Sequence, residues 1–460
     1  MNDVRPFRGL RFRETLVGAL GEVVCPPYDV ISPEEQRALH DRSPFNVVRL
    51  ELGLQMPGDD ASDNRYTRSA LTLNRWLAEG ALVEEKDPAL YLYEQRFPHE
   101  GRTLARWGIF ARQRLATWDE GVVLPHEETL AGPKADRLQL MRATRCNLSP
   151  LFLLFEDPSG TVRAMMEDSS RRPADATADT GDGQVHRLWV VQGEPQRRLA
   201  AALQTPQLFM ADGHHRYETA LAYRDERRKE PDWTPPPNPL PLGESGGGSP
   251  PRRGEGPGMG SGAPYDFAMV LLVDAADPGL VVLPTHRVVR GVDPSLLNRL
   301  DEALERVFRV DRLEAGDGHA AATAQMLLRR MQERGLEGPA LAIYRKEGGG
   351  AAVLSLRELV EGRPDGRPVL DVDVLHDVLL EPMLAVGPEE LRAGTHVSYT
   401  RDASEAVAAV DRGDAQVALL LNPTRVDQVL ATARARGKMP QKSTYFYPKP
   451  TTGLVINPLW

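Results

Sequence analysis

The sequence predicts an α+β or mixed α/β protein with several domains. Strand-like and helix-like patterns alternate along the chain, and several neighbouring strands are typical of hairpins rather than of a pure doubly wound sheet. The length of 460 residues exceeds what one ordinary core contains. We therefore expect an N-terminal α/β region at residues 1–185, a second region at 186–310 and a C-terminal α/β region at 311–460.

Short apolar runs indicate strands rather than membrane helices, because none approaches the roughly 20 residues that a membrane span needs. The longest runs, which should be buried strands, are residues 151–155, 267–273 and 417–421. Paired or additional strands are expected at residues 91–97, 107–113, 188–191, 341–344 and 352–356, the last two forming a hairpin through Gly348, Gly349 and Gly350.

Helical periodicity predicts helices at residues 195–203, 214–228, 296–307, 320–334 and 426–436. Residues 168–184 read as a loop. A second segment, residues 229–264, contains 10 Pro and 9 Gly among its 36 residues, which predicts a disordered loop that interrupts the second region.

Composition favours a cytoplasmic protein that has real cores and no membrane or nucleic-acid partner. The hydrophobic fraction is 41%, above that of a disordered chain. The formal net charge is -9, and a non-specific nucleic-acid binder needs a basic face. The only two cysteines, Cys25 and Cys146, have no metal-like spacing and form no disulfide framework, which fits a reducing compartment.

The strongest candidate site is the segment from Asp212 to Arg216. Apolar residues lead into Asp212 and Gly213, and a helical pattern follows. A glycine that enters a helix lets the backbone approach a ligand, and the first helical N–H groups favour phosphate. Arg216 can add bidentate hydrogen bonds to such a phosphate. His214 and His215 can donate protons or hydrogen bonds near neutral pH.

Two other interpretations of this segment stay open. In the first it is an ordinary helix start, with Asp212 as the N-cap and two solvated histidines. In the second it holds a metal, since His214 and Glu218 are spaced i, i+4 on one helix face, as metal ligands can be. No third ligand stands at a telling spacing, so the metal content stays unknown.

A second polar segment covers residues 124–137. The pair His126 and Glu127 could supply a general base, while Lys134 and Arg137 could supply cationic anchors. An exposed loop that opens a helix is the alternative. Taken with the first segment, the expected catalytic residues are Glu127, His126 and His215, and the expected phosphate-binding residues are Asp212, Gly213, His214, Arg216, Lys134 and Arg137.

Three further segments carry weaker signals. Residues 442–453 alternate aromatic residues with lysines and hydroxyls, which indicates a strand with a mainly structural role, although the two lysines and the hydroxyls could instead meet an anionic ligand. Residues 25–29 read as a rigid turn because two prolines stand side by side. Residues 284–287 place a His-Arg pair at the end of a strand, as a ligand contact would require.

These segments together resemble a widespread prokaryotic family that is known only as a domain of unknown function, number ten-fifteen. The motifs that carry the resemblance are CPPYDVIS at 25–32, PHEET at 125–129, KADRLQL at 134–140, NLSPLF at 147–152, ADGHHRYETA at 211–220, PTHR at 284–287 and KSTYFYPK at 442–449. The resemblance covers nearly the whole chain, and the Pro/Gly-rich segment departs from the compact family pattern. The family name implies no activity.

A more distant resemblance does imply one. Residues 213–220 resemble the phosphate-binding box of the ParB and sulfiredoxin superfamily, and its free-serine kinases carry a similar Asp-Gly-His-His-Arg. The resemblance implies a ParB-like nucleotide-binding element in which Gly213, His214, His215 and Arg216 hold the nucleotide phosphates. It spans about ten residues and does not extend to the base, so Glu127 is chosen for its chemistry.

The sequence therefore favours a nucleotide-dependent phosphotransferase that uses ATP or ADP with Mg²⁺ and acts on a small hydroxyl substrate, with free L-serine as the leading candidate. No Walker-type glycine loop is present, which argues against an ordinary P-loop kinase. The alternatives are a metal-dependent hydrolase that uses His214, His215 and Glu218, and a non-enzymatic nucleotide-binding or DNA-binding regulator. The sequence does not determine the oligomeric state.

Overall fold

The computed structural model describes residues 2–127, 131–229, 262–314, 319–346, 350–358, 363 and 366–460, without the side chains of residues 131–133 and 392. Most of the predicted disordered loop, and Gly348 and Gly349 of the predicted hairpin turn, lie outside the described residues. The chain divides into two compact units. Unit 1 comprises Met1–Leu124, Thr129–Leu280 and Pro448–Trp460, and unit 2 comprises Pro125–Glu128 and Val281–Tyr447.

These two units differ from the three regions expected from the sequence. The expected boundary at residue 185 falls at the first residue of strand β10 (Val185–Val191), and that at residue 310 falls inside strand β15 (Phe308–Leu313). Either boundary would cut a strand that is paired in a sheet. The difference arises because strands distant in sequence share a sheet, which composition along the chain does not reveal.

Unit 1 is built on a nine-stranded mixed sheet, so the predicted mixed α/β architecture is confirmed. Strand β1 (Val4–Arg5) pairs with β5 but lies outside the linear order of the other strands. The other strands follow the order β6 (Val123–Leu124), β11 (Leu208–Asp212), β8 (Leu151–Phe155), β12 (Phe267–Asp274), β5 (Arg102–Arg114), β4 (Leu90–His99), β10 and β9 (Ala176–Asp179). The β6–β11 and β8–β12 pairs are parallel, and the others are antiparallel.

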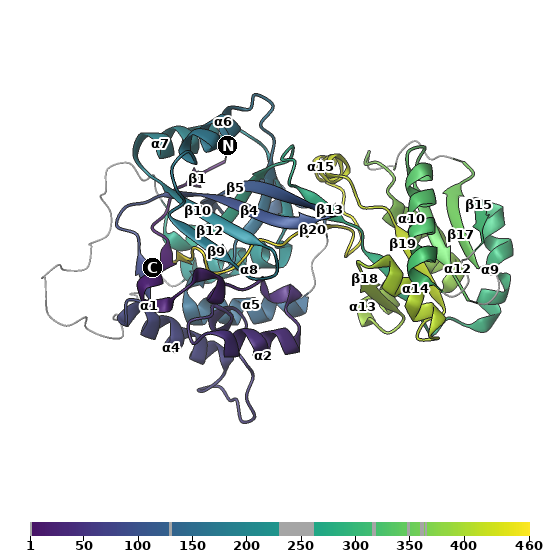
Figure 1. The fold of residues 1–460 in the computed structure, drawn as a ribbon, viewed down its shortest axis with the longest axis horizontal. Helices are drawn as coiled ribbons and strands as arrows, with labels where there is room; N and C mark the ends of the chain where they lie inside the picture. Colours follow the sequence, from purple (N-terminus) through teal and green to yellow (C-terminus); the bar gives the residue numbers. More distant parts are fainter. Residues whose placement is uncertain are drawn as a thin grey trace, which may run out of the picture. The chain divides into compact units, whose positions relative to one another are not determined.

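Helices cover both faces of this sheet (Figure 1). Helices α6 (Thr161–Ser169) and α7 (Gly193–Ala202) lie on one face. The other face carries a group that includes α2 (Pro33–Arg42), α4 (Arg65–Ala78), α5 (Ala131–Thr144) and α8 (His214–Lys229). Shorter elements of unit 1 are α1 (Glu14–Val17), α3 (Val48–Glu51), the 3₁₀ turns η1 (Leu20–Glu22), η2 (Tyr28–Val30), η3 (Trp118–Glu120) and η4 (Pro264–Asp266), and the strand pairs β2 (Leu10–Phe12) with β3 (Leu82–Glu84) and β7 (Cys146–Asn147) with β21 (Asn457–Pro458).

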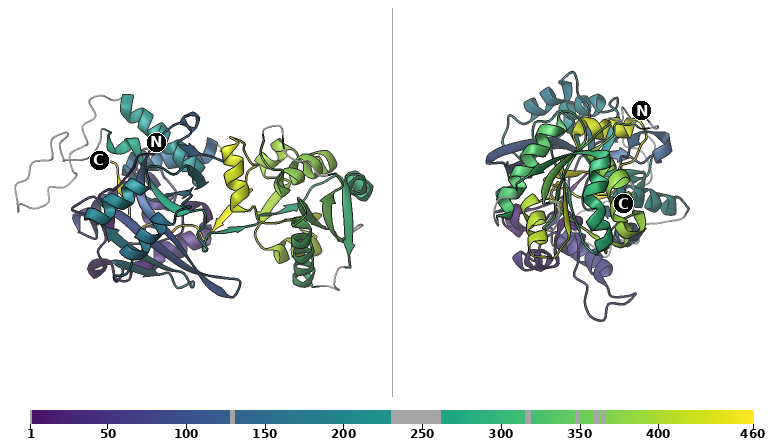
Figure 2. Two further views of the ribbon diagram at one scale, coloured as in Figure 1. Left: turned by 90° about the horizontal axis from the view of Figure 1, so that it is seen from above. Right: turned by 90° about the vertical axis from the view of Figure 1, so that its right-hand side faces the viewer.

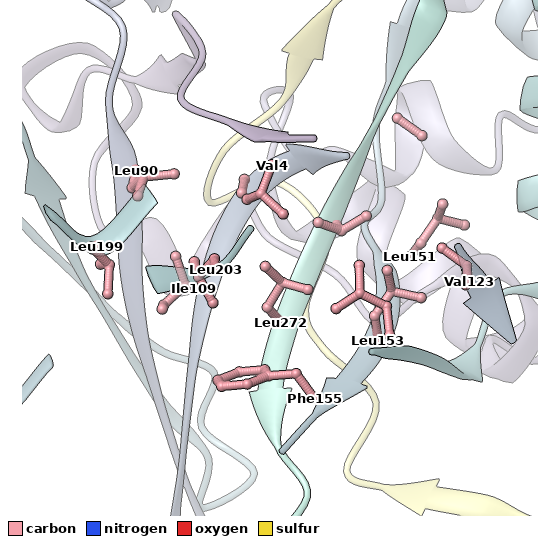
Figure 3. Close-up of a cluster of buried hydrophobic side chains, with 14 of the residues drawn as sticks. Val4, Leu90, Ile109, Val123, Leu151, Leu153, Phe155, Leu199, Leu203 and Leu272 are labelled. Carbon is pink, nitrogen blue, oxygen red and sulfur yellow. The ribbon is translucent and has the colours of Figure 1, made fainter. Parts of the chain in front are cut away.

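The core of unit 1 joins the sheet to helices α6, α7 and α8. Figure 3 shows side chains of neighbouring strands, among them Leu90, Ile109, Leu153 and Leu272, in one cluster that also includes Leu199. Burial of such side chains supplies most of the favourable free energy of folding, at about 25 cal/mol per Å² of apolar surface. This core holds the carboxyl end of β11, where the candidate site begins.

Several predicted elements of unit 1 are confirmed. The predicted strand pair is the β4–β5 hairpin, which is longer than predicted and pairs Tyr91 with Phe110. The fully apolar runs at 151–155 and 267–273 are the buried strands β8 and β12. The predicted loop at 168–184 is wrong in part, because residues 176–179 form strand β9. Its two buried alanines, Ala176 and Ala178, are too small to give a strong apolar signal.

Unit 2 has a six-stranded antiparallel sheet with helices on both sides (Figure 2). Its strand order is β15, β17 (Ala351–Leu356), β16 (Ala340–Tyr344), β19 (Val417–Leu421), β14 (His286–Val289) and β18 (Val397–Thr400). The predicted hairpin is the β16–β17 pair. Strand β13 (Val281–Leu283) pairs separately with β20 (Tyr445–Tyr447), which confirms the strand expected near the C-terminus.

The helices of unit 2 are α9 (Pro294–Val307), α10 (Ala320–Gly335), α11 (Asp371–Val374), the π-helical turn η5 (Leu375–Leu380), α12 (Glu381–Leu384), α13 (Pro388–Ala393), α14 (Ala403–Asp411) and α15 (Val426–Arg434). Helices α10 and α14 pack on one sheet face through residues such as Leu327, Val407 and Leu420. Among the described residues of both units, every helix is too short or too polar to cross a bilayer.

Asp371 of unit 2 has a raised pKa, which makes stability depend on pH. Its carboxylate accepts hydrogen bonds from the Ala340 N–H at 3.1 Å and the Asn422 side chain at 2.9 Å. Burial outweighs these bonds and raises the pKa of Asp371 to about 6. The folded protein therefore takes up a proton between pH 7 and 5 that the unfolded chain does not, so wild-type stability gains as pH falls through 6.

We expect Asp371→Asn to remove this gain. Relative to the variant, the wild type should become more stable by about 1 kcal/mol between pH 7 and pH 5, because one pKa unit corresponds to about 1.4 kcal/mol. Denaturant unfolding of both proteins at the two pH values measures the difference. Altered hydrogen bonding in the variant adds an offset that does not change with pH. An unchanged difference would show that Asp371 has an ordinary pKa in the folded protein.

Candidate functional site

The candidate site in unit 1 begins where β11 ends and α8 starts. Gly213 joins the two elements with φ at +99°, a backbone conformation that side chains disfavour. A Cβ atom at this position would also stand 3.1 Å from Leu151 Cδ2 and from Arg216 Nη2. The turn therefore requires glycine on two grounds. It leaves the first N–H groups of a 16-residue helix at the end of a sheet strand, and these groups and the helix dipole favour an anion.

Asp212 precedes this turn and pairs with two cations. Its Oδ2 accepts from Arg216 Nη2 at 2.7 Å, and its Oδ1 pairs with Lys449 Nζ. Arg216 also donates from Nη1 to the carbonyl oxygen of Pro150 at 2.5 Å. The Lys449 side chain is only 8% exposed. The Asp212–Arg216 pair thus connects the start of α8 to Pro150, just before β8, and Asp212 connects it to Lys449 in the C-terminal segment, residues 448–453.

Lys449 brings a third segment to the site. Its Nζ stands 3.6 Å from Asp29 Oδ2, in the short turn η2 that follows Pro26 and Pro27. The Asp29 side chain is 36% exposed, against 17% for Asp212. Backbone hydrogen bonds between Cys25 and Thr452 in both directions, at 2.8 and 3.2 Å, fasten this turn to the C-terminal segment. Residues 25–29, 212–216 and 448–453 therefore meet at one place.

Helix α5 adds cations on the neighbouring side of α8. Lys134 Nζ donates to Glu218 Oε2 at 2.6 Å, one turn into α8. The Arg137 guanidinium lies 4.0 Å from the centre of the Tyr28 ring and donates to the Glu51 carbonyl at 2.9 Å. Burial raises the pKa of Tyr28, and the positive charges of Arg216 and Arg137 oppose this shift. Tyr28 thus stands within the field of both guanidinium groups.

The two histidines differ in their surroundings. His214 is 5% exposed, with its ring centre 6.5 Å from that of Trp118. The Trp118 indole donates to Glu218 Oε1 at 3.2 Å. His215 is half-buried, and its carbonyl accepts from the Thr219 hydroxyl at 2.8 Å. His214 therefore helps to fix the first turn of α8, whereas His215 has partial access to solvent.

A small cavity lies behind Arg216. It measures about 40 Å³, and its lining includes Glu51, Arg137 and Ser149. Ser149 donates to Glu51 Oε1 at 3.0 Å, and Arg137 pairs with the same oxygen at 3.6 Å. A volume of this order holds about one or two water molecules. It is too small for a nucleotide, so a phosphate-bearing ligand would have to bind elsewhere around the start of α8.

His126 and Glu127, which we expected to be catalytic, belong to unit 2. His126 is fully buried, and its Nε2 stands 3.0 Å from Thr444 Oγ1. Glu127 Oε1 accepts from the Lys442 backbone N–H at 2.8 Å. Both residues thus contact residues 442–444, near the end of unit 2. The role of Glu127 as the base stays a prediction.

The metal interpretation of His214, His215 and Glu218 does not match this geometry. Glu218 is engaged by Lys134 and Trp118. Within the described parts of the chain, no group of three or more His, Cys, Asp and Glu side chains is close enough to hold a metal ion.

Sequence reasoning centred the candidate site on residues 212–216, and two further ionisable residues lie beside Asp212 in the structure. Asp29 was treated as part of a rigid turn, and Lys449 as part of a structural strand. A local signal was present in both cases, since Lys449 stands between Pro448 and Pro450 and Asp29 follows Pro27 by two positions. Only the fold shows that both lie beside Asp212.

The geometry defines an α/β protein with a polar cluster at a strand-to-helix turn, and the family comparison agrees with this chain's motifs. Residues 4–373 match the model of the family described as "Protein of unknown function (DUF1015)". The chain belongs to that family. No curated protein matches the sequence.

Solved structures show remote similarity only. A conserved hypothetical protein from Pyrococcus furiosus is 12% identical, covering 74% of this chain and 90% of its own, with a TM-score of 0.33. A free serine kinase in complex with AMP is 12% identical, covering 74% and 86%, with a TM-score of 0.34. SbnI with a C-terminal truncation, from Staphylococcus aureus, is 11% identical, covering 74% and 85%, with a TM-score of 0.31.

Replacing Lys449 should destabilise unit 1. Lys449→Met leaves the Asp212 and Asp29 carboxylates without their shared cation, which should cost about 1–3 kcal/mol for partly buried groups. Adding Asp212→Asn should recover part of this loss, because the two residues interact directly. Denaturant unfolding measures both effects, and Lys86→Met, at an exposed lysine of the same unit, serves as the control. Equal stability of Lys449→Met and wild type would show that the ion pairs of Lys449 with Asp212 and Asp29 do not stabilise unit 1.

Proposed function

We propose that the protein is a nucleotide-dependent phosphotransferase that acts on a small hydroxyl substrate, with free L-serine as the first candidate. The observation that carries this proposal is the Gly213 turn, which starts a 16-residue helix beside a carboxylate that pairs with Arg216 and Lys449. Phosphoryl transfer depends mainly on positioning and on charge stabilisation around phosphates. A helix start with nearby cations supplies both.

The residues around the turn fit a phosphate group. Gly213 allows the tight turn because a Cβ atom there would crowd Leu151 and Arg216, and the first N–H groups of α8, at His214 and His215, are the donors to the phosphate. Lys134 adds a positive charge one turn further along. Arg216 and Arg137 already donate to protein carbonyls and carboxylates, so they contribute charge and hold the local backbone. The box formed by residues 213–220 is the proposed ParB-like nucleotide-binding element.

Two carboxylates are candidates for the base that accepts the substrate hydroxyl proton. The first candidate is Asp29 of unit 1, whose side chain is more exposed than that of Asp212, the other carboxylate that pairs with Lys449. Its position after Pro26 and Pro27 limits its motion, as a positioned base requires. Glu127 of unit 2 is the base chosen from the sequence. The geometry of unit 1 favours Asp29.

ATP or ADP would supply the phosphoryl group. Mg²⁺ prefers carboxylate oxygens and phosphate oxygens as ligands, and the carboxylate of Asp212 is of that type. L-Serine is the first candidate acceptor because the Asp-Gly-His-His-Arg order at 212–216 resembles the box of free-serine kinases.

The activity can be measured directly. With Mg²⁺ and ATP or ADP, the purified protein should convert L-serine to O-phosphoserine, detected by mass spectrometry or ³¹P NMR. Asp29→Asn should lower turnover by about 100-fold or more, the usual contribution of a positioned base, while nucleotide binding persists. Asp87→Asn, at an exposed aspartate of unit 1, is the matched control and should leave turnover unchanged.

Glu127→Gln separates the two candidate bases. Loss of turnover in this variant together with full activity of Asp29→Asn would assign the base to Glu127. Nucleotide binding without phosphorylation of any amino acid would favour a nucleotide-binding regulator. If neither nucleotide stabilises the protein against heat and no amino acid is phosphorylated, the phosphotransferase proposal is wrong.

A further inference from the structure

Three sequence motifs that lie outside the turn at Gly213 come together in unit 2. Residues 125–127 contact residues 439–444 through His126 with Thr444, Glu127 with Lys442, and a parallel bridge between Glu127 and Met439. The third motif, residues 284–287, reaches the same segment through Arg287, whose Nη2 lies 3.5 Å from the Gln441 carbonyl oxygen. Segments about 150 and 300 residues apart in sequence thus surround Arg287.

Arg287 is an unusually placed cation. It sits in β14, where its Cα stands opposite those of Tyr399 in β18 and Leu419 in β19, and it is 1% exposed. Its Nη1 donates to the Thr285 carbonyl, and its Nε is buried without a hydrogen-bond partner among the described residues. Within the described parts of unit 2, no carboxylate forms an ion pair with it.

Burial of the Arg287 charge is energetically unfavourable, and the surrounding groups compensate for it only in part. Burial lowers the pKa of Arg287 to about 10, and the electrostatic interactions with Tyr399 and Glu127 offset the shift only in part. A guanidinium at pH 7 still carries its charge, and a buried charge without an ion-pair partner destabilises the folded protein. An oxyanion that accepts from Nε and from a terminal nitrogen would satisfy both the free donor and the charge.

A histidine completes the surroundings of Arg287. His376 lies in the π-helical turn η5, and its Nε2 is also buried without a hydrogen-bond partner among the described residues. Burial and the Arg287 charge lower the pKa of His376 to about 4, so it is neutral at pH 7 and can donate one hydrogen bond. Isolated π-helical turns are frequent at functional sites.

The other titratable groups near Arg287 add little charge of their own. Burial also lowers the pKa of His286 to about 4, and its Nδ1 accepts from the Leu421 N–H at 3.2 Å. Asp377, beside His376, pairs with Arg363 at 2.5 Å. Glu127 is the carboxylate that opposes Arg287, and it accepts from the Lys442 backbone.

We propose that unit 2 carries a second ligand site, in which Arg287 and His376 bind a small carboxylate or phosphate oxyanion. The Arg287 Nε and the His376 Nε2 are its donors, and Tyr399, whose ring centre lies 5.1 Å from the guanidinium carbon, forms its outer wall. The site is independent of phosphoryl transfer and of the turn at Gly213. It gives residues 125–127, 284–287 and 439–444 a shared role in holding one anion.

Hydrogen exchange of the full-length protein tests this site separately from the one in unit 1. The probes are sodium acetate and sodium phosphate, each compared with sodium chloride at equal ionic strength. We expect protection of β14, β18 and residues 440–444. Protection by acetate alone identifies a carboxylate site, protection by phosphate alone identifies a phosphate site, and protection by both identifies a general oxyanion site.

Variants separate binding from packing. Arg287→Lys keeps the charge but loses the fork of donors, so the concentration for half protection should rise about tenfold. His376→Phe should have a similar effect, and it keeps the test valid if Arg287→Lys fails to fold. Arg309→Lys, at an exposed arginine of β15, is the matched control and should behave as wild type. Absence of protection in unit 2 with either probe, or equal protection in wild type and both site variants, would overturn the proposal.

Discussion

The carboxylate of Asp212 lies between two cations that reach it from different parts of the chain. Arg216 comes from the first turn of α8, and Lys449 comes from the segment that ends unit 1. Lys449 also reaches Asp29 near the N-terminus. The interactions are largely shielded from water, which makes them stronger than surface pairs and costly to break. The alignment of the Gly213 turn, and therefore any anion site at the start of α8, depends on them.

Local sequence patterns predicted most individual elements because those elements depend on local periodicity. The buried strands β8, β12 and β19 are the three apolar runs that the sequence marked, and α8 and α10 match their predicted helices to within one residue at each end. Strand β9 was missed because its buried residues are alanines. The two-unit division was not predicted, since it depends on pairing between strands far apart in the sequence.

The candidate site shows the same limit. The residues at 212–216 were identified because several ionisable side chains beside a glycine form a local signal. Asp29 and Lys449 contribute through a contact between residues more than 400 positions apart, which no local pattern can reveal. Glu127 was grouped with Lys134 because they are close in sequence, whereas the fold places them in different units. Arg287 was flagged as a strand-end residue, but its unpaired burial required the structure.

Calorimetric titration of ATP and ADP with Mg²⁺ into Gly213→Ala tests the central claim most directly. The substitution places a methyl group 3.1 Å from Leu151 at a positive φ, so the turn that positions the first N–H groups of α8 has to shift. Gly160→Ala is the matched control, because Gly160 also has a positive φ before a helix but has open space around it. We expect wild type and Gly160→Ala to bind at least one nucleotide with similar affinity, and Gly213→Ala to bind it at least about tenfold more weakly, since each lost charge-assisted hydrogen bond contributes about 1.5–3 kcal/mol. Wild-type affinity in Gly213→Ala, or no binding of either nucleotide by the wild type, would contradict a phosphate site at this turn.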